Sequence, residues 1–377
     1  MADAVHPRLI SLFLPSLAGG GAERVFVELA NGFTEHGVAV DLVLASASGP
    51  YTSEICDAVR VVDLKCRGVL RAIPRLARYL AREQPAALLS ALDHANVGAL
   101  LARVIAKSPT RCVVSMRSVP RAVYREAPSI RGRVLLQLMK VTYPLADGIV
   151  ANSRAVAADL SGLLRSERNI TVIYNPLDMD RVERLSREDL GHPWAAAGAP
   201  PVILGVGSLT GLKDFRTLVR AFSLVRSQRP CRLVILGEGP ERAAIETLLR
   251  QLGVQDDAYL PGFIGNPFPW MRCSRVFVSS SLTEGCPNAL MQALACRMAV
   301  VSTDCAGGSA EILENGKWGQ LVPVGDSQSM AGAIKSALDT PSSFRAYDRA
   351  LDFAPGRISQ RYLAALLPES TAALPPG

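Results

Sequence analysis

A glutamate and a glutamine in the second half of the chain have a spacing that suits a bound ligand. The stretch EGCPNALMQ, residues 284–292, begins as a polar loop and continues as an apolar helix whose first turn is set by Pro287 and Asn288. Glu284 then lies on the loop and Gln292 on the second helical turn, so both side chains can reach the same ligand. The junction is therefore predicted to hold a ligand.

The helix start and an upstream lysine favour an anion in this place. The backbone N–H groups of Asn288, Ala289 and Leu290 are expected to be free donors, and the helix dipole directs them at negative charge. Lys213, in GVGSLTGLKDF, falls where a loop meets a helix, so its ammonium group can neutralise a phosphate. A lysine that is merely solvated is the alternative interpretation.

Glycines follow several expected strands, where a backbone can approach a ligand closely. LAGGGAERV places Gly20 and Gly21 at the start of a helix, and Gly262 follows a later strand. A dinucleotide fingerprint does not fit, because its third glycine position is Arg24 and Asp41 lies near the start of the second strand. A tight turn with a purely structural role stays open for the first glycines.

Other reactive side chains have a chemical and a structural interpretation. His94 follows a strand and precedes a helix, so it can touch a substrate hydroxyl or act as a structural histidine. Cys286 lies beside Glu284 but has no partnered base, which favours packing over nucleophilic catalysis. The carboxylates Asp178 and Asp180 have the spacing of a metal-binding pair but begin an interdomain connection. No metal site is expected.

The elements that position these residues belong to parallel α/β domains, because short β-branched runs alternate with amphipathic segments along the chain. Strands are expected at 8–14, 38–44, 59–64, 86–90, 111–115, 148–151 and 170–174, with a helix between 15 and 37. The second half restarts with PVILGVGSL, RLVILGEG, RVFVSS and MAVVSTD, each followed by a helical segment. Parallel sheets bind ligands beyond the carboxyl ends of their strands, where the residues named above fall.

Periodicity is lost in LSREDLGHPWAAAGAPP, which predicts a domain boundary. We expect an N-terminal domain at 1–184, a linker at 185–200 and a C-terminal domain at 201–355. Residues 356–377 form a C-terminal helix and tail, and this helix can return to the first domain. A cleft is expected between the two domains.

Composition indicates a globular protein with two cores, since 49% of its 377 residues are hydrophobic and 20% are charged. The eight cysteines include no C-x-x-C pair, which favours a reduced, cytoplasmic protein. The N-terminal run LISLFL lacks a basic flank and predicts a buried strand instead of a signal peptide. A net charge of +7 favours an anionic partner, and an aromatic content of 6% argues against nucleic acid.

Several motifs in this order resemble those of the retaining GT-B glycosyltransferases, a large E-x7-E family of bacterial polysaccharide and glycolipid enzymes. The motifs are GGGAERVFVELANGF, ADGIVANSRAVAADL, VIYNPLD, GVGSLTGLKDFRTLVRAF, LVILGEGPER and SSSLTEGCPNALMQALACRMAVVSTDCAGGSAEIL. The resemblance implies two Rossmann-like domains facing each other across a cleft, with a nucleotide-diphosphate sugar bound mainly by the second. It also implies that a saccharide or lipid-linked acceptor binds mainly to the first, and no cofactor or metal is expected.

The resemblance also assigns residue roles. Glu284 contacts the donor sugar, position 292 contacts the ribose, and Lys213 binds the diphosphate. We expect catalytic roles for Glu284, Lys213 and His94, and donor binding by Gly20, Gly21, Gly207, Ser208, Gly262, Phe263, Ile264, Asn288, Ala289, Leu290 and Gln292. Backbone groups around Gly262 to Ile264 are expected to recognise the base.

Three positions depart from the family pattern. Gln292 replaces the second glutamate, so it keeps hydrogen-bonding capacity but lacks the charge. Ser208 stands where many relatives have an arginine beside the diphosphate, and Arg297 stands where most have a glycine that ends the helix. A non-catalytic nucleotide-sugar-binding partner subunit therefore stays open as an alternative. A nucleotide-sugar epimerase is a further alternative.

Two basic stretches lie in the expected acceptor domain. In RGVLRAIPRLARYLARE one helix face carries arginines and the other carries apolar residues, although Pro74 can interrupt the helix. The arginines are Arg67, Arg71, Arg75, Arg78 and Arg82. They predict docking on anionic lipid, at the inner face of the cell membrane, or on a lipid-diphosphate acceptor, with a solvated face as the alternative. The second stretch is MRSVPRAVYREAPSIRGR.

Overall fold

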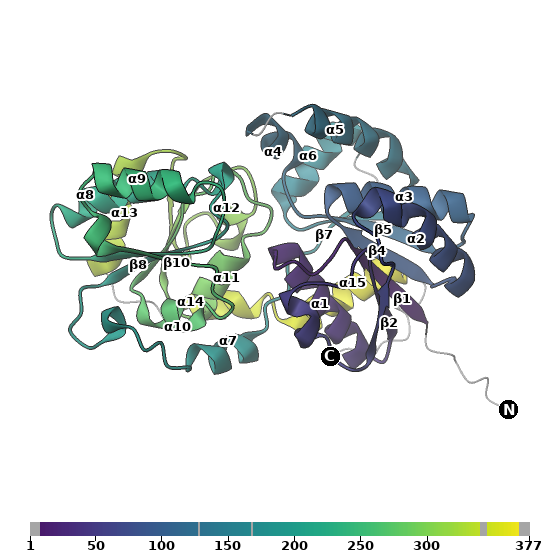
Figure 1. Cartoon of the computed structure of the whole chain (residues 1–377), viewed down its shortest axis with the longest axis horizontal. Helices are drawn as coiled ribbons and strands as arrows, with labels where there is room; N and C mark the ends of the chain where they lie inside the picture. Colours follow the sequence, from purple (N-terminus) through teal and green to yellow (C-terminus); the bar gives the residue numbers. More distant parts are fainter. Residues whose placement is uncertain (1–7, 127–128, 167–168, 340–344, 369–377) are drawn as a thin grey trace. The chain divides into compact units, whose positions relative to one another are not determined.

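The computed structural model describes residues 8–126, 129–166, 169–339 and 345–368. The chain divides into two compact units (Figure 1). Unit 1 comprises Met1–Pro176 and Pro355–Gly377, and unit 2 comprises Leu177–Ala354. Each unit is a parallel sheet with helices on both faces, which confirms the predicted fold of two Rossmann-like domains.

Unit 1 contains a seven-stranded parallel sheet with the order β3-β2-β1-β4-β5-β6-β7. Its strands are β1 (Leu9–Leu14), β2 (Ala39–Leu44), β3 (Val59–Asp63), β4 (Ala87–Ala91), β5 (Arg111–Met116), β6 (Gly148–Ala151) and β7 (Ile170–Val172). The order reverses between β1 and β4, so the crevice that suits a ligand lies at the carboxyl ends of these two strands.

Alternating side chains of the strands build two cores, one on each face of this sheet. Leu12 and Leu14 pack with α1 (Gly21–Glu35) and α15 (Pro355–Leu366), whereas Phe13 packs on the opposite face. The helices of that opposite face are α2 (Val69–Glu83), α3 (Asp93–Ala106), α4 (Pro120–Glu126), α5 (Ile130–Thr142) and α6 (Arg154–Leu164), with η2 (Tyr143–Leu145) after α5. Helices α2 and α3 lie side by side (Figure 1).

Helix α2 runs through Pro74 without a break, so the suggested interruption of the helix is wrong. Proline removes one backbone hydrogen bond from a helix interior. The buried residues Leu76, Tyr79 and Leu80 lie on the C-terminal side of Pro74 and pack into the core of unit 1. Most helical stability in proteins comes from such packing, which here outweighs the lost bond.

Unit 2 contains a six-stranded parallel sheet with the order β10-β9-β8-β11-β12-β13. Its strands are β8 (Val202–Val206), β9 (Arg232–Leu236), β10 (Ala258–Gly262), β11 (Val276–Ser279), β12 (Ala299–Thr303) and β13 (Gln320–Val322). One face carries α8 (Phe215–Arg226), α9 (Arg242–Gln251) and α13 (Ser327–Asp339). The other carries α10 (Phe268–Cys273) and α11 (Asn288–Ala295), with α7 (Met179–Ser186) and α14 (Arg345–Leu351) packed on them. The order reverses between β8 and β11.

The first segment of unit 1 ends at Pro176, before the expected boundary at 184, and the expected linker 185–200 belongs to unit 2. Helix α7 contacts α10 and α11 of unit 2. The segment after it is held by an aromatic cluster. The centroid of the His192 ring lies 4.8 Å from that of Tyr259 and 4.9 Å from that of Trp270. Loss of periodicity thus marks an irregular segment that is packed by its rings, not a free linker.

None of the helices within the described ranges combines the length and the apolar character that crossing a bilayer requires.

Candidate active site

A lysine and a glutamate meet where the strand order of unit 2 reverses. Lys213 ends the short helix η4 (Gly211–Lys213) after β8, and Glu284 lies in the loop after β11. The two strands are hydrogen-bonded neighbours, so their following loops emerge at the same edge of the sheet. The Nζ atom of Lys213 lies 2.5 Å from Oε1 of Glu284. This edge is the crevice in which doubly wound sheets bind ligands.

Two serines after β11 hold the pair in place. The hydroxyl of Ser281 donates to Oε1 of Glu284 at 2.6 Å, and that of Ser280 donates to the backbone carbonyl of Lys213 at 2.8 Å. The side chains of Lys213 and Glu284 are 27% and 11% exposed. Both charged groups are thus oriented by the protein and still open to a ligand.

The backbone behind Glu284 depends on a glycine. The Glu284 N–H donates to the carbonyl of Ala306 at 3.0 Å, and the Gly308 N–H donates to that of Gly285 at 2.8 Å. Gly307 has φ +140°, and a Cβ atom there would lie 1.7 Å from the Glu284 carbonyl oxygen. A side chain at Gly307 would therefore displace the loop that carries the carboxylate.

The turn after β8 lies against the side chain of Lys213. A Cβ atom on Gly207 would lie 3.4 Å from Cε of Lys213, which is an ordinary van der Waals contact, so the stem of the lysine packs directly against this turn. Ser208 is exposed and supplies a hydroxyl where an arginine would supply a charge. Gly237, at the end of β9, has φ +146°, and a Cβ atom there would lie 1.9 Å from the Gly207 carbonyl oxygen. The backbone at the end of β9 therefore lies directly against the turn that follows β8.

At the start of α11, one of the three backbone N–H groups that were expected to be free is already hydrogen-bonded. The Leu290 N–H donates to the carbonyl of Pro287 at 3.1 Å, so it is not a free donor for an anion. The 3₁₀-type bond arises because the chain turns tightly at Pro287 as the helix begins. Asn288 and Ala289 are half-buried at the helix start, and Gln292 is half-buried on its second turn. The predicted anion site at α11 thus loses the amide of Leu290.

A buried thiol near Glu284 has a packing role. Cys286 is buried, and its Sγ atom lies 3.4 Å from Sδ of Met291. This contact agrees with the packing interpretation of the cysteine, because a thiol among apolar atoms behaves as a small hydrophobic side chain.

The end of β10 presents a backbone turn and an exposed ring. Gly262 is buried with φ +90°, and its carbonyl accepts from the Gly237 N–H at 2.8 Å. Phe263 follows and is 58% exposed, and Ile264 is half-buried. An exposed phenyl ring beside backbone groups is a surface on which a planar base can stack.

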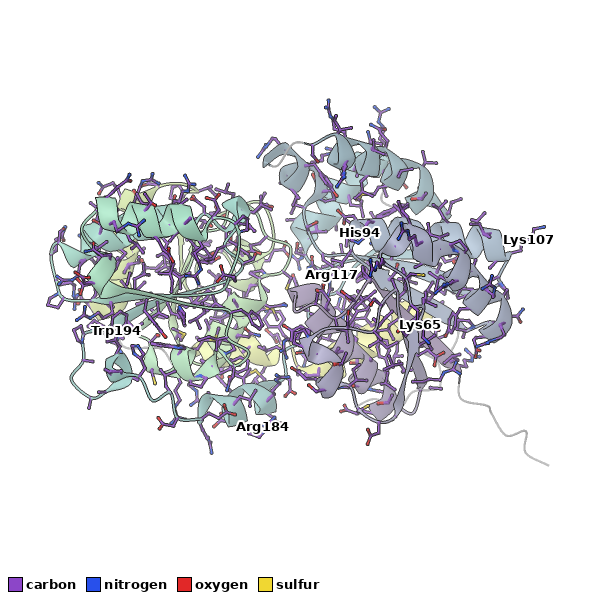
Figure 2. The ribbon with its side chains drawn as sticks, viewed as in Figure 1. Lys65, His94, Lys107, Arg117, Arg184 and Trp194 are labelled. Atoms are coloured by element: carbon purple, nitrogen blue, oxygen red, sulfur yellow. The ribbon has the colours of Figure 1, made fainter. Side chains whose placement is uncertain are left out.

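The predicted residues of unit 1 lie at its own switch point, between β1 and β4. Gly20 is the N-cap of α1 and Gly21 its first residue, while His94 is exposed in the first turn of α3 (Figure 2). Asp93, beside it, accepts a 2.8 Å hydrogen bond from the Tyr124 hydroxyl. Burial raises the pKa of Asp93, and the Tyr124 hydrogen bond and the His94 charge partly oppose this.

Arg117 is a functional candidate that sequence reasoning grouped with surface arginines. It directly follows β5, is half-buried, and donates from Nη1 to the Tyr362 hydroxyl at 3.1 Å (Figure 2). Its Nη2 atom is buried and has no hydrogen-bond partner among the described residues. The position of Arg117 at a strand's carboxyl end was a signal that could have distinguished it. Ser281 and Gly307 were also missed, although the run of three serines that begins at the end of β11 pointed to Ser281.

A separate groove of about 540 Å³ in unit 2 lies along α7, α10 and the C-terminal end of α11. Its lining includes Glu183, Arg187, Arg272 and Arg297, and none of the predicted donor-binding residues. In the described part of the chain, no three His, Cys, Asp or Glu side chains are grouped so that they could bind a metal ion.

Comparison with known proteins links this geometry to a family. Residues 200–340 match the family model described as glycosyl transferases group 1, and residues 19–181 match that of glycosyltransferase family 4. The second match begins after β1 and includes β4, and the first includes both β8 and β11. The chain is a glycosyltransferase.

Relatives of this glycosyltransferase extend over most of its length. The N-acetylgalactosamine-N,N'-diacetylbacillosaminyl-diphospho-undecaprenol 4-alpha-N-acetylgalactosaminyltransferase of Campylobacter jejuni is 28% identical, covering 90% of this chain and 92% of the relative. The lipopolysaccharide core biosynthesis glycosyltransferase LpsE of Rhizobium meliloti is 27% identical, and the match covers 84% of this chain and 85% of the relative.

Solved structures share the fold of this glycosyltransferase. Sucrose-phosphate synthase of Thermosynechococcus elongatus has a TM-score of 0.80 at 19% identity, covering 97% of this chain and 100% of that one. Anabaena Alr3699/HepE, in complex with UDP and glucose, has a TM-score of 0.77 at 20% identity. The match covers 95% of this chain and 99% of that one. The architecture is GT-B, as the sequence motifs predicted.

Proposed function

We propose that this glycosyltransferase transfers a hexosyl group, with retention at the anomeric carbon, from a nucleotide-diphosphate sugar to a saccharide or lipid-linked acceptor. The observation that carries the proposal is the Lys213–Glu284 pair at the switch point of unit 2. The proposed biological role is the synthesis of a cell-surface polysaccharide or glycolipid, in the cytoplasm or on the inner face of the membrane.

The charges of the pair suit the chemistry of sugar transfer. Cleavage of the bond between sugar and phosphate builds positive charge on the sugar ring and negative charge on the departing diphosphate. In the proposed complex the ammonium group of Lys213 stabilises the diphosphate, and the carboxylate of Glu284 binds the sugar. Positioned groups of this kind lower the barrier because they need no reorganisation during the reaction.

The remaining donor contacts are proposed from the roles that the family resemblance implies. Gln292 bonds the ribose hydroxyls, the backbone at Asn288 and Ala289 faces the diphosphate, and Phe263 stacks on the base. His94 and the unpaired Nη2 donor of Arg117 are assigned to the acceptor in unit 1. The Campylobacter relative, named for a diphospho-undecaprenol substrate, supports a lipid-linked acceptor. The UDP and glucose bound to Anabaena Alr3699/HepE support a nucleotide-sugar donor.

The test is to incubate the protein with UDP-, GDP- and ADP-sugars and to measure release of nucleoside diphosphate. Lys213→Ala and Glu284→Ala should each lower turnover about 100-fold or more while the protein stays folded. Arg216→Ala is the matched control, since it removes the Arg216–Glu241 pair on the surface of the same unit. Full activity in either site variant, or an equal loss in the control, would refute the site assignment.

Two further measurements address the finer parts of the proposal. The NMR coupling constant of the anomeric proton in the product distinguishes retention from inversion, and an inverted product would overturn the retaining mechanism. Turnover should persist after treatment with EDTA, because the proposal assigns stabilisation of the diphosphate charge to Lys213 and the helix amides. A loss that Mg²⁺ restores would show that a metal ion shares this role.

A non-catalytic, donor-binding partner subunit is the second candidate. It is favoured by Ser208 and Gln292, which both lack a charge that the family pattern has. Donor binding by calorimetry without release of nucleoside diphosphate would support this candidate. An altered sugar without release would support an epimerase.

A further inference from the structure

Helix α5 of unit 1 exposes a row of large apolar side chains. Ile130 and Val141 are 73% and 71% exposed, and Val134 and Leu138 are also exposed, as is Leu145 in η2 just after the helix. Val104 and Ile105, at the C-terminal end of α3, are exposed as well. These seven residues make up half of the fourteen exposed large hydrophobic side chains in the described part of the chain. Such a concentration marks an interaction surface.

The spacing of this row forms a stripe along the helix. At about 100° per residue, Ile130, Val134, Leu138 and Val141 fall within about 80° of the helix circumference. Exposed Arg131 borders the stripe on one side. On the other side it is bordered by Arg133 and Lys140, which are likewise exposed. The helix sequence IRGRVLLQLMKVT contains no acidic residue.

The opposite side of α5 is fixed to unit 1. Met139 and Thr142 are buried there, and the Ser129 hydroxyl caps the helix by accepting from the Gly132 N–H at 3.0 Å. Arg103 of α3 donates to the Leu145 carbonyl at 3.2 Å, which brings the exposed end of α3 next to η2. The stripe is therefore the outer face of a packed helix and is held in shape before any partner binds.

We propose that the apolar stripe, defined as Ile130, Val134, Leu138, Val141 and Leu145 with Val104 and Ile105, inserts into an anionic lipid surface. Amphipathic helices with basic borders lie in the membrane interface with their apolar face among the upper acyl chains. The basic residues beside the stripe face the negatively charged headgroups. This inference does not depend on the proposed transfer reaction.

Charge distinguishes a lipid surface from a second copy of the chain. Both borders of the stripe are basic, so two copies packed stripe to stripe would bring like charges together whatever their direction. An anionic lipid surface has the complementary charge.

The stripe is also better suited to insertion than the arginine face of α2, which was the sequence-based expectation. Leu70 is the one large hydrophobic residue of α2 that is exposed, although all of α2 is described. Arg75 already donates to the carbonyls of Leu64 and Lys65, and Arg82 pairs with Glu83. The α2 face thus offers charge but only a single exposed large apolar side chain.

The test is co-flotation of the full chain with vesicles of phosphatidylcholine alone or mixed with phosphatidylglycerol. The wild type should float with the anionic vesicles. The double variant Ile130→Glu/Val141→Glu should bind them about tenfold or more weakly, because two inserted side chains become charged. Leu70→Glu is the matched control, since Leu70 is 84% exposed but lies on α2, and it should bind as the wild type does.

A second pair of variants tests the charges. Arg131→Gln/Arg133→Gln/Lys140→Gln should weaken anionic binding, whereas Arg71→Gln/Arg78→Gln/Arg82→Gln, with the same change in net charge on α2, should not. Circular dichroism checks that each variant is folded. Failure of the wild type to float, or flotation of the Ile130→Glu/Val141→Glu variant at wild-type level, would overturn the proposal. A change in sedimentation coefficient without a change in flotation would assign the stripe to self-association instead.

Discussion

The ammonium nitrogen of Lys213 lies 2.5 Å from Oε1 of Glu284, although the two residues are 71 positions apart in the sequence. Parallel pairing of β8 with β11 brings their loops together, and the hydroxyl of Ser281 then shares the same carboxylate oxygen. In the proposed reaction a bound diphosphate competes with Glu284 for the lysine. Donor binding would thereby release the carboxylate to contact the sugar.

Ser281→Ala should lower kcat/KM about tenfold to 100-fold, because the serine orients Glu284 through a hydrogen bond to a charged group. Ser302→Ala is the control. Ser302 is also buried in unit 2, but its hydroxyl donates to the backbone carbonyl of Thr303 and not to either member of the pair. Steady-state kinetics of nucleoside diphosphate release measures both variants. Equal losses in the two would show that the serines act through folding alone.

Gln292→Glu should lower the donor KM several-fold, since a carboxylate forms stronger hydrogen bonds to ribose hydroxyls than a carboxamide does. Gln292→Ala should raise the donor KM, and both variants should leave the acceptor KM unchanged. Initial rates with each substrate varied in turn provide these constants. If neither variant changes the donor KM, residue 292 does not contact the nucleotide.

Arg297→Gly should stabilise unit 2 by roughly 0.5 kcal/mol. Arg297 follows the end of α11 with φ +60°, where the N–H groups of Arg297 and Met298 donate to the carbonyls of Leu294 and Ala293. Glycine relieves about 1 kcal/mol of left-handed strain, which exceeds the loss of the guanidinium contact with the Tyr347 ring at 4.7 Å.

Arg297→Ala provides the contrast, because it keeps the strain and loses the ring contact. It should destabilise the protein in urea titrations, with an unchanged m-value. If the glycine and alanine variants change the free energy of unfolding in the same direction, this account of residue 297 is contradicted.

Asp93→Asn should stabilise the protein at pH 7. Because burial raises the pKa of Asp93, the folded state binds more protons than the unfolded state between the unfolded pKa and the raised pKa. Stability of the wild type therefore falls as pH rises through this window. Asparagine is always neutral and can still accept the Tyr124 hydrogen bond. Urea midpoints at pH 7 and below pH 3.8 should show an advantage of the variant that disappears in acid.

Sequence patterns located the strands well, because each parallel strand is an apolar run that glycine or polar residues end. The first strand was expected at 8–14 and lies at Leu9–Leu14, while the strand expected at 170–174 ends at Val172. The meeting of Lys213 with Glu284 follows from strand order, which the chain's alternation of elements does not determine. Here the resemblance to known glycosyltransferases supplied what periodicity could not.

Features that depend on tertiary contacts were beyond the sequence. The amide of Leu290 was expected to be free but is used by the carbonyl of Pro287, because the helix begins with a tighter turn than ideal geometry assumes. Arg117 resembled other arginines until its burial beside Tyr362 distinguished it. The Ala- and Pro-rich stretch around Trp194 (Figure 2) resembled a linker, because the edge-on contact of its ring with the distant Tyr259 ring has no local sequence pattern.

The return of α15 to unit 1 affects how a newly made chain can fold. Ile358, Tyr362, Leu363 and Leu366 belong to the same apolar cluster as β1 and α1, and Ser359 packs against Gly32. During synthesis on the ribosome, the first 176 residues cannot complete this core until all of unit 2 and then α15 have been made. Unit 2 is continuous and can complete its core first. The half of the protein that is synthesised first is thus the half whose folding finishes last.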